Sequence, residues 1–376
     1  MPEGPSNTIE QYFGDLPDPR ESNISHPLIN IVTITICAVI CGADSWTDVQ
    51  MFGEAKQAWL STFLDLRHGV PSHDTIGRVF RVLDPAAFAE RFEAWTRHIC
   101  QQIDNEVVAI DGKQLRGSKD GAVGTAGITM VNVWATENQL SLSSTKVDEK
   151  TNEITVIPEL LRLLDIEGSV ITLDAMGCQT EIASEIRQQS ADYVLAVKGN
   201  QATLLDDLER TFAHADGLAT LDYVRTVDKG HGRLDSRECW AIADPDILAY
   251  VNNYKTWSGL TSLVKVTSER RLLAQAKVER QTRYFISSLA AKAADLLHAI
   301  RAHWQVENSL HWVLDMAFRE DNSRVRKDHA PQNFAIIRQL ALNLLQRDTS
   351  LKVGINAKRK RAGWDHDYLL KILCSA

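Results

Sequence analysis

Apolar residues recur at helical spacing through the first hundred positions of the chain. Pro27 precedes a segment in which Ile31 to Ile40 would form a buried helix. Asp84-Pro85 combines a capping side chain with a proline suited to the first helical turn. The apolar face of the helix that follows would hold Phe88, Phe92, Trp95 and Ile99. We therefore predict a helical N-terminal domain over residues 1–104.

After residue 105 the pattern changes to short apolar runs that alternate with helical segments. The runs predict strands at 107–110, 128–135, 140–147, 169–173 and 193–197. Helices are indicated at 157–164 and 181–189. Three adjacent strands followed by alternating helices and strands predict an α/β fold, a mixed sheet with helices on its faces.

The next segment, about 205–290, is predicted to be a β-rich insertion. A helix at 204–212 precedes strand-like runs at 226–242, 261–267 and 284–289. A long helix is then expected from Asp295 to Phe318, and a last one from Pro331. A basic run over 358–361 lies in a predicted basic C-terminal tail, residues 351–376.

Composition narrows the class of protein. With 376 residues, 44% hydrophobic and 24% charged, the chain is typical of a folded protein of two or three domains. The net charge of −8 argues against a protein that coats nucleic acid. The charge is uneven, because residues 301–376 hold 13 basic and 8 acidic side chains. A local nucleic-acid face near that end stays open, beside an ordinary charged tail.

Three absences in the sequence favour a cytoplasmic protein. None of the six cysteines forms a CxxC pair, so a disulfide framework or zinc knuckle is not expected. The start, MPEGPSNTIEQ, has no basic region typical of a secretory signal. The most apolar stretch, 28–43, is shorter than the roughly 20 residues that span a bilayer.

Two predicted strands end on carboxylates, Asp111 and Asp174. Sites collect at strand ends of open α/β sheets, and Mg²⁺ prefers oxygen ligands. A third carboxylate, Glu307, lies on the helix expected to cover the sheet. On that helix His303, Glu307, His311 and Asp315 recur every four residues and share a face.

Other interpretations of these residues stay open. Either aspartate alone could be a turn or cap residue. A zinc site is disfavoured because the HExxH order is absent. Glu320 and Asp321 are alternative ligands if the helix register differs.

Four motifs resemble a known family. The runs AIDGKQLRGS from Ala109, LDAMGCQ from Leu173 and HWQVENSLHW from His303 resemble the bacterial insertion-sequence DDE transposases, in the group that includes the H-repeat-associated proteins. GVPSHDT from Gly69 resembles that group's N-terminal associated domain. The resemblance implies an RNase H-like catalytic domain over 105–350. It also implies a metal-binding catalytic triad of Asp111, Asp174 and Glu307, with two Mg²⁺ ions or Mn²⁺ in their place. The β-rich insertion matches what relatives carry between the last two triad members.

One signature of wider relatives is missing from the last catalytic helix. Where they have tyrosine, arginine and lysine, this chain has Ile300, His303 and Leu314. Phosphate contacts by that arginine and lysine are therefore not carried over. His303 would either contact a DNA phosphate in the arginine's place or hydrogen-bond Glu307 and orient it.

The implied partner is double-stranded DNA, both element ends and target, bound by a homodimer near the bacterial nucleoid, with no membrane association. Phosphate contacts are expected from basic side chains near the strand ends, in the insertion and in the basic C-terminal part. The candidates are Lys113, Arg116, Lys198, His231, Arg233, His303, Arg324 and Arg326.

The expected function is metal-dependent cleavage at the ends of an insertion sequence, followed by strand transfer into target DNA. The alternatives are a transposase-derived DNA-binding protein without catalysis and a general metal-dependent nuclease. The presence of all three acidic residues favours an active transposase.

Overall fold

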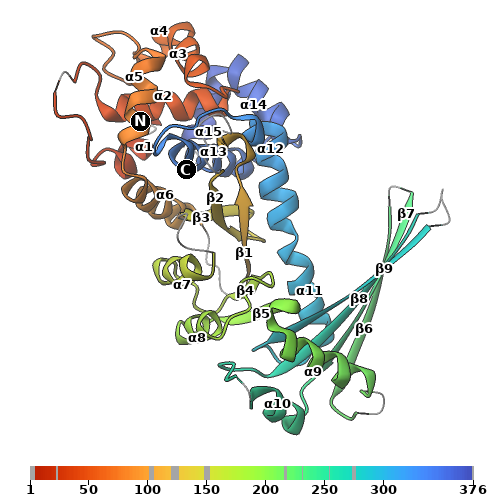
Figure 1. Ribbon diagram of the computed structural model, residues 1–376. Coiled ribbons are helices and arrows are strands. Elements are labelled where there is room, and N and C mark those ends of the chain that lie inside the picture. The colour runs from red at the N-terminus through yellow and green to blue at the C-terminus, as the bar shows by residue number, and fades with distance from the viewer. Residues whose placement is uncertain are drawn as a thin grey trace.

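The computed structural model describes residues 5–22, 24–100, 106–119, 127–147, 153–215, 218–230, 232–253, 255–272 and 277–374. Figure 1 shows a cluster of helices from both ends of the chain, a sheet with flanking helices, and long strands that extend to one side. A helical rod over residues 293–318 runs from the long strands to the helical cluster (Figure 1).

The N-terminal region is helical, as its apolar spacing predicts. Its helices are α1 (Pro5–Phe13), α2 (Leu28–Ile40), α3 (Trp46–Ala55), α4 (Gln57–Leu60), α5 (His73–Val82) and α6 (Pro85–Ile99). Asp84 caps α6 by accepting a hydrogen bond from the amide of Ala86. The apolar α2 is buried and packs against α13 (Ala330–Arg347), so the two ends of the chain share one core.

The predicted mixed sheet is present. Its first half consists of β1 (Val107–Gln114), β2 (Thr129–Ala135), β3 (Leu140–Val147), β4 (Val170–Leu173) and β5 (Asp192–Val197). β1 to β3 form an antiparallel meander, whereas β1, β4 and β5 run parallel. The crossover helices are α7 (Glu153–Leu163) and α8 (Thr180–Gln188).

The insertion continues the same sheet. After α9 (Ala202–Ala213) come β6 (Leu221–Gly230), β7 (Arg233–Ile242), α10 (Pro245–Asn252), β8 (Ser262–Leu272) and β9 (Lys277–Ser287). β9 pairs antiparallel with β5, which gives nine strands in the order β3-β2-β1-β4-β5-β9-β8-β7-β6. The predicted run at 226–242 is in fact two strands, since Gly232 has a positive φ of 72° at the turn between them.

The rod combines three segments: α11 (Ala293–His303), a π-helical segment η3 (Val306–His311) and α12 (Trp312–Phe318). The sequence predicts one regular helix here, and the difference is the wider turn that contains Glu307. π-helical turns inside α-helices are frequent at functional sites.

The predicted basic tail is wrong, because most of it is helical and packed. α14 (Ile355–Trp364) and α15 (His366–Cys374) contact α13. Lys358 is buried and donates to the carbonyl of Leu345, and Arg359 donates to that of Val39 at 2.7 Å. Half of the basic run therefore satisfies backbone oxygens inside the protein.

All six cysteines lie in the described part of the chain and are free thiols. Within that same part, no helix has the length and apolar character needed to cross a membrane.

Candidate active site

Three carboxylates that the sequence singles out line one pocket of about 210 Å³. Asp111 lies on β1, and Asp174 directly follows β4. Ile110 pairs with Leu173 between these parallel strands, so the two aspartates sit at equivalent places. Glu307 reaches the same pocket from the rod. The structure thus brings the three together, while their role as metal ligands stays a prediction.

The electrostatics of this pocket are dominated by negative charge. Burial, and then the charges of Glu307 and Asp174, raise the pKa of Asp111 to about 8. The pKa of Glu307 is lowered, chiefly by its hydrogen bond with His311. A divalent cation would relieve this crowding, and carboxylate oxygens are the donors that Mg²⁺ prefers. The residues present therefore fit such an ion.

The rod turns a row of polar side chains toward the sheet, as its four-residue spacing predicts. His303 contacts the hydroxyl of Thr172 through Nδ1 at 3.0 Å. Glu307 lies 3.5 Å from Nδ1 of His311, which in turn lies 3.8 Å from Asp111. Ligand atoms of Asp111, Glu307 and His311 lie within 4.8 Å of one another.

One of the two predicted roles of His303 is a hydrogen bond that orients Glu307. In the free protein this bond is not made, because Nδ1 of His303 contacts Thr172 instead. Burial lowers the pKa of His303, although the nearby charge of Asp174 opposes the shift. His303 lines the pocket, so a bound phosphate could still contact it.

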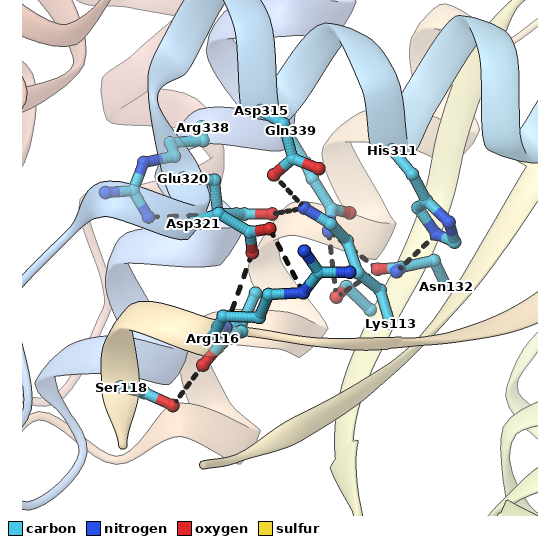
Figure 2. A network of polar contacts seen from close by, with 12 residues as sticks. Lys113, Arg116, Ser118, Asn132, His311, Asp315, Glu320, Asp321, Arg338 and Gln339 are labelled. Atoms are coloured by element: carbon cyan, nitrogen blue, oxygen red, sulfur yellow. Dashed lines mark hydrogen bonds and ion pairs between the residues drawn. The ribbon is translucent and has the colours of Figure 1, made fainter. Parts of the chain in front are cut away.

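Lys113, predicted to contact DNA, is placed in a buried ion-pair network instead. Its side chain is 8% exposed, and its ammonium pairs with Asp315 and, at 2.9 Å, with Glu320 (Figure 2). Arg338 lies 3.7 Å from the other oxygen of Glu320. Burial would lower the pKa of Lys113, but the carboxylates of Glu320 and Asp315 raise it. Lys113 is therefore engaged inside the protein rather than presented to DNA.

The same network shows that Glu320 and Asp321, the alternative metal ligands, lie elsewhere. Glu320 is 2% exposed and held by Lys113, and Asp321 lies 3.5 Å from Arg116. Neither residue lines the pocket of Asp111. Glu320 therefore pairs with Lys113 and Asp321 with Arg116, outside the pocket.

The remaining DNA-contact candidates fall into separate groups. Lys198 lines the pocket with His303. Arg116 and Arg324 are exposed, and Arg326 donates to the carbonyl of Gly117 beside them. Arg233 pairs with Asp235 on the long strands. His231 lies outside the described residues.

Two residues of the pocket escape sequence reasoning. Arg283, on β9, places its guanidinium 4.7 Å from the ring centre of Trp304, and both line the pocket. Nothing near Arg283 in the sequence marks it, because it reaches the pocket only through the pairing of β9 with β5.

Glu153 at the start of α7 is a further acidic neighbour. A Cβ on Gly112 would lie 2.2 Å from an oxygen of Glu153, so the glycine allows this close approach. Burial and the charge of Asp174 raise the pKa of Glu153. Gly112, a glycine inside β1, is the signal that could have indicated a crowded neighbour.

Comparison with known proteins identifies the class. Residues 102–344 match the family model described as "Transposase DDE domain", and residues 10–96 match "DDE_Tnp_1-associated". The chain belongs to the DDE transposase family, which confirms the resemblance of its motifs.

Its relatives define the group within that family. The chain is 39% identical over 372 residues to "H repeat-associated putative transposase YhhI" of Escherichia coli K12, covering 98% of each chain. It is equally identical to "Putative transposase YncI" of Escherichia coli O157:H7, covering 98% of this chain and 95% of that one. Among solved structures, a piggyBac transposase synaptic complex with hairpin DNA matches with a TM-score of 0.43 and 10% identity, over 97% of this chain and 76% of the other.

Proposed function

We propose that this protein is an active transposase that cuts DNA at the ends of its element and joins the freed 3′-hydroxyl to target DNA. The observation that carries the proposal is the convergence of Asp111, Asp174 and Glu307, from three separate elements, on one pocket. Paired metal sites in phosphodiester chemistry need several carboxylates from rigid elements facing one cavity.

Asp111, Asp174 and Glu307 would hold two Mg²⁺ ions, or Mn²⁺ in their place. The ions supply activation of the attacking oxygen and stabilisation of the leaving one. The raised pKa of Asp111 supports a cation here, because its causes after burial are the charges of Glu307 and Asp174 in the same pocket. Lys198 lines the pocket and would bind the phosphate beside the cut.

Double-stranded DNA would lie across the pocket and the exposed arginines. The proposed contacts are Lys198 and His303 in the pocket, with Arg283 added to them, and Arg116, Arg324, Arg326 and Arg233 outside it. Joining two element ends in one reaction requires two copies of the chain, so we propose a homodimer on DNA, near the nucleoid. The domains would be residues 1–104 and 105–350, with the packed C-terminal helices added to the first.

The experiment that tests this function is cleavage of DNA carrying the element ends, with Mg²⁺. Asp111→Asn removes one charge and keeps the shape, so cleavage should fall by at least 100-fold while DNA binding stays. Asp367→Asn, at an exposed position on α15, is the matched control and should cleave as the wild type does. Wild-type binding without cleavage would instead favour the DNA-binding protein that has lost catalysis.

A further inference from the structure

His311 lies between the acidic pocket and a buried polar cluster. Its side chain is buried, with Nδ1 3.5 Å from Oε2 of Glu307 and 3.8 Å from Oδ2 of Asp111. Its other nitrogen, Nε2, lies 3.1 Å from the side-chain nitrogen of Asn132 on β2. Asn132 is the residue opposite Asp111 in the β1–β2 pairing. Figure 2 shows His311, Asn132 and Gln339 in one line of contacts.

Hydrogen bonds with buried neighbours fix the orientation of Asn132. We call Asn132 and these neighbours, Ser141, Ser144 and Gln339, the amide cluster. Oδ1 of Asn132 accepts hydrogen bonds from Ser144 and from Gln339, each at 2.8 Å. Oε1 of Gln339 accepts one from Ser141 at 2.6 Å. All four side chains are buried, so each of their polar atoms needs a hydrogen-bond partner within the protein.

These bonds determine which nitrogen of His311 carries the proton. Because Oδ1 of Asn132 is used, its NH₂ group faces His311. An amide NH₂ can only donate, so Nε2 must accept and cannot carry a proton. The proton of the neutral ring is then on Nδ1, which faces the two carboxylates.

We propose that His311 is a positioning residue, held as the Nδ1–H tautomer, that donates toward Glu307 and Asp111 and does not itself bind the metal. The proposal rests on the proposed function, since it assumes that these carboxylates hold the ion. The single Nδ1–H of His311 then points to Oε2 of Glu307 at 3.5 Å, with Oδ2 of Asp111 farther away at 3.8 Å, and it restricts how the side chain of Glu307 turns. Partners of this kind orient ligands, and their loss typically costs about 10- to 100-fold in metal affinity or activity.

The competing role for His311 is that of a third ligand, as its distance from the carboxylates would permit. Binding through Nδ1 requires that nitrogen to be free of its proton, which places the proton on Nε2. The Nε2–H group would then face the NH₂ group of Asn132, and two donors would oppose each other in a buried site. To remove this conflict between two donors, the side-chain amides of both Asn132 and Gln339 would have to rotate by about 180° and exchange their oxygen and nitrogen positions. The tautomer therefore separates the two roles.

The direct test is nitrogen NMR of the full-length protein labelled with ¹⁵N-histidine. His311 is assigned by the signals that disappear in His311→Asn, and His298→Asn, at an exposed position on α11, is the matched control. We expect protonated Nδ1 and bare Nε2 without metal, and the same pattern after Mg²⁺ is added. A protonated Nε2, or loss of the Nδ1 proton with Mg²⁺, would overturn the proposal. The measurement needs no cleavage, so it can fail while the proposed function holds, or the reverse.

A rescue experiment tests the donor itself. The side-chain nitrogen of asparagine can take the place of Nδ1, whereas leucine provides no donor. His311→Leu should raise the Mg²⁺ concentration for half-maximal cleavage by about 10- to 100-fold. In His311→Asn this Mg²⁺ concentration should return at least half of the way to the wild-type value on a logarithmic scale. The DNA affinity of both variants should equal that of the wild type. Equal losses in the two variants would contradict a donor role, and unchanged cleavage in both would contradict any role.

Discussion

At the scale of single residues, burial and the neighbouring carboxylates have their largest effect in the pocket on the pKa of Asp111. Its folded-state pKa of about 8 lies far above the ordinary value of 3.8. Ionising it in the folded protein therefore costs free energy, and the stability it contributes without metal is present below about pH 4 and lost as the pH rises toward 8. A bound cation would reverse this penalty.

The first prediction is a pH dependence of metal binding. Below pH 8 the ion must displace the proton of Asp111, so Mg²⁺ affinity should rise by up to about tenfold per pH unit and level off above pH 8. Calorimetric titration of Mg²⁺ between pH 6 and pH 9 measures this. Asp111→Asn should bind Mg²⁺ weakly with little pH dependence. A flat wild-type profile below pH 8 would show that no such proton is displaced.

The second prediction concerns His303, which is buried against Thr172 and has a lowered pKa. Binding a DNA phosphate would favour its charged form, so the neutral histidine should weaken binding as the pH rises. Arginine stays charged throughout. His303→Arg should therefore keep DNA affinity and reduce its change between pH 5.5 and pH 7.5, measured by fluorescence anisotropy. Intact binding with an unchanged pH profile would exclude the phosphate contact.

At the scale of elements, the rod is held over the sheet by the ion pairs of Lys113. Its partners belong to the rod and to the short η4 helix (Glu320–Asn322) that follows it. Because Lys113 lies two residues after Asp111 on β1, the same strand carries the pocket and the anchor of the helix that completes it. This arrangement ties the position of Glu307 to that of Asp111.

The third prediction is that Lys113→Met destabilises the fold by about 3–5 kcal/mol, since it removes the ammonium that pairs with the buried Glu320 and the partly buried Asp315. Arg116→Met is the matched control. That arginine is 80% exposed in its ion pair, so its loss should cost within about 0.5 kcal/mol. Urea unfolding measures both. Equal free energies of unfolding in the two variants would contradict the inference that Lys113 anchors the rod.

Local pattern predicts the strands and the two aspartates, because an apolar run that stops at an aspartate is visible in neighbouring residues. Asp174 directly follows its strand, whereas β1 continues past Asp111 to Gln114. The network of Lys113 is invisible in this way, since its partners lie 202 and 207 positions away. The π-helical turn around Glu307 is not visible in the sequence either, since Val306 to His311 carry an ordinary helical pattern; in the structure this turn contacts β1 and β2. Glu307 is predicted from its place on the helix expected to cover the sheet, and the family resemblance then implies its role in the triad.

At the scale of the whole molecule, charge is distributed less simply than the sequence suggests. Residues 301–376 hold the excess of basic side chains, yet Arg338, Lys358 and Arg359 are buried there. The basic run at 358–361 leaves both a nucleic-acid face and an ordinary charged tail open, because burial cannot be read from a charged run. The proposed DNA surface is instead the pocket and the exposed arginines near η1 (Arg116–Ser118).

The fourth prediction is a steep salt dependence of DNA binding despite the acidic total charge. Side chains that neutralise phosphates release counterions, so log affinity should fall linearly with log salt, with a slope near −0.9 per contact. Arg324→Gln, at an exposed position, should reduce the slope by about one contact. Arg97→Gln on α6 is an exposed control on the N-terminal helices and should leave it unchanged. A slope near zero would contradict phosphate binding.

The most direct test of the central claim is a change of metal preference at Asp174. A thiolate prefers softer ions than Mg²⁺, so Asp174→Cys should lose cleavage of element-end DNA in Mg²⁺ and regain it in Mn²⁺ or Cd²⁺. Asp174→Ala, which offers no ligand, should stay inactive with every ion. This pattern would show that Asp174 binds the ion that cuts DNA. Full activity of Asp174→Cys in Mg²⁺, or equal rescue of both variants, would contradict the assignment of the three carboxylates as the metal site.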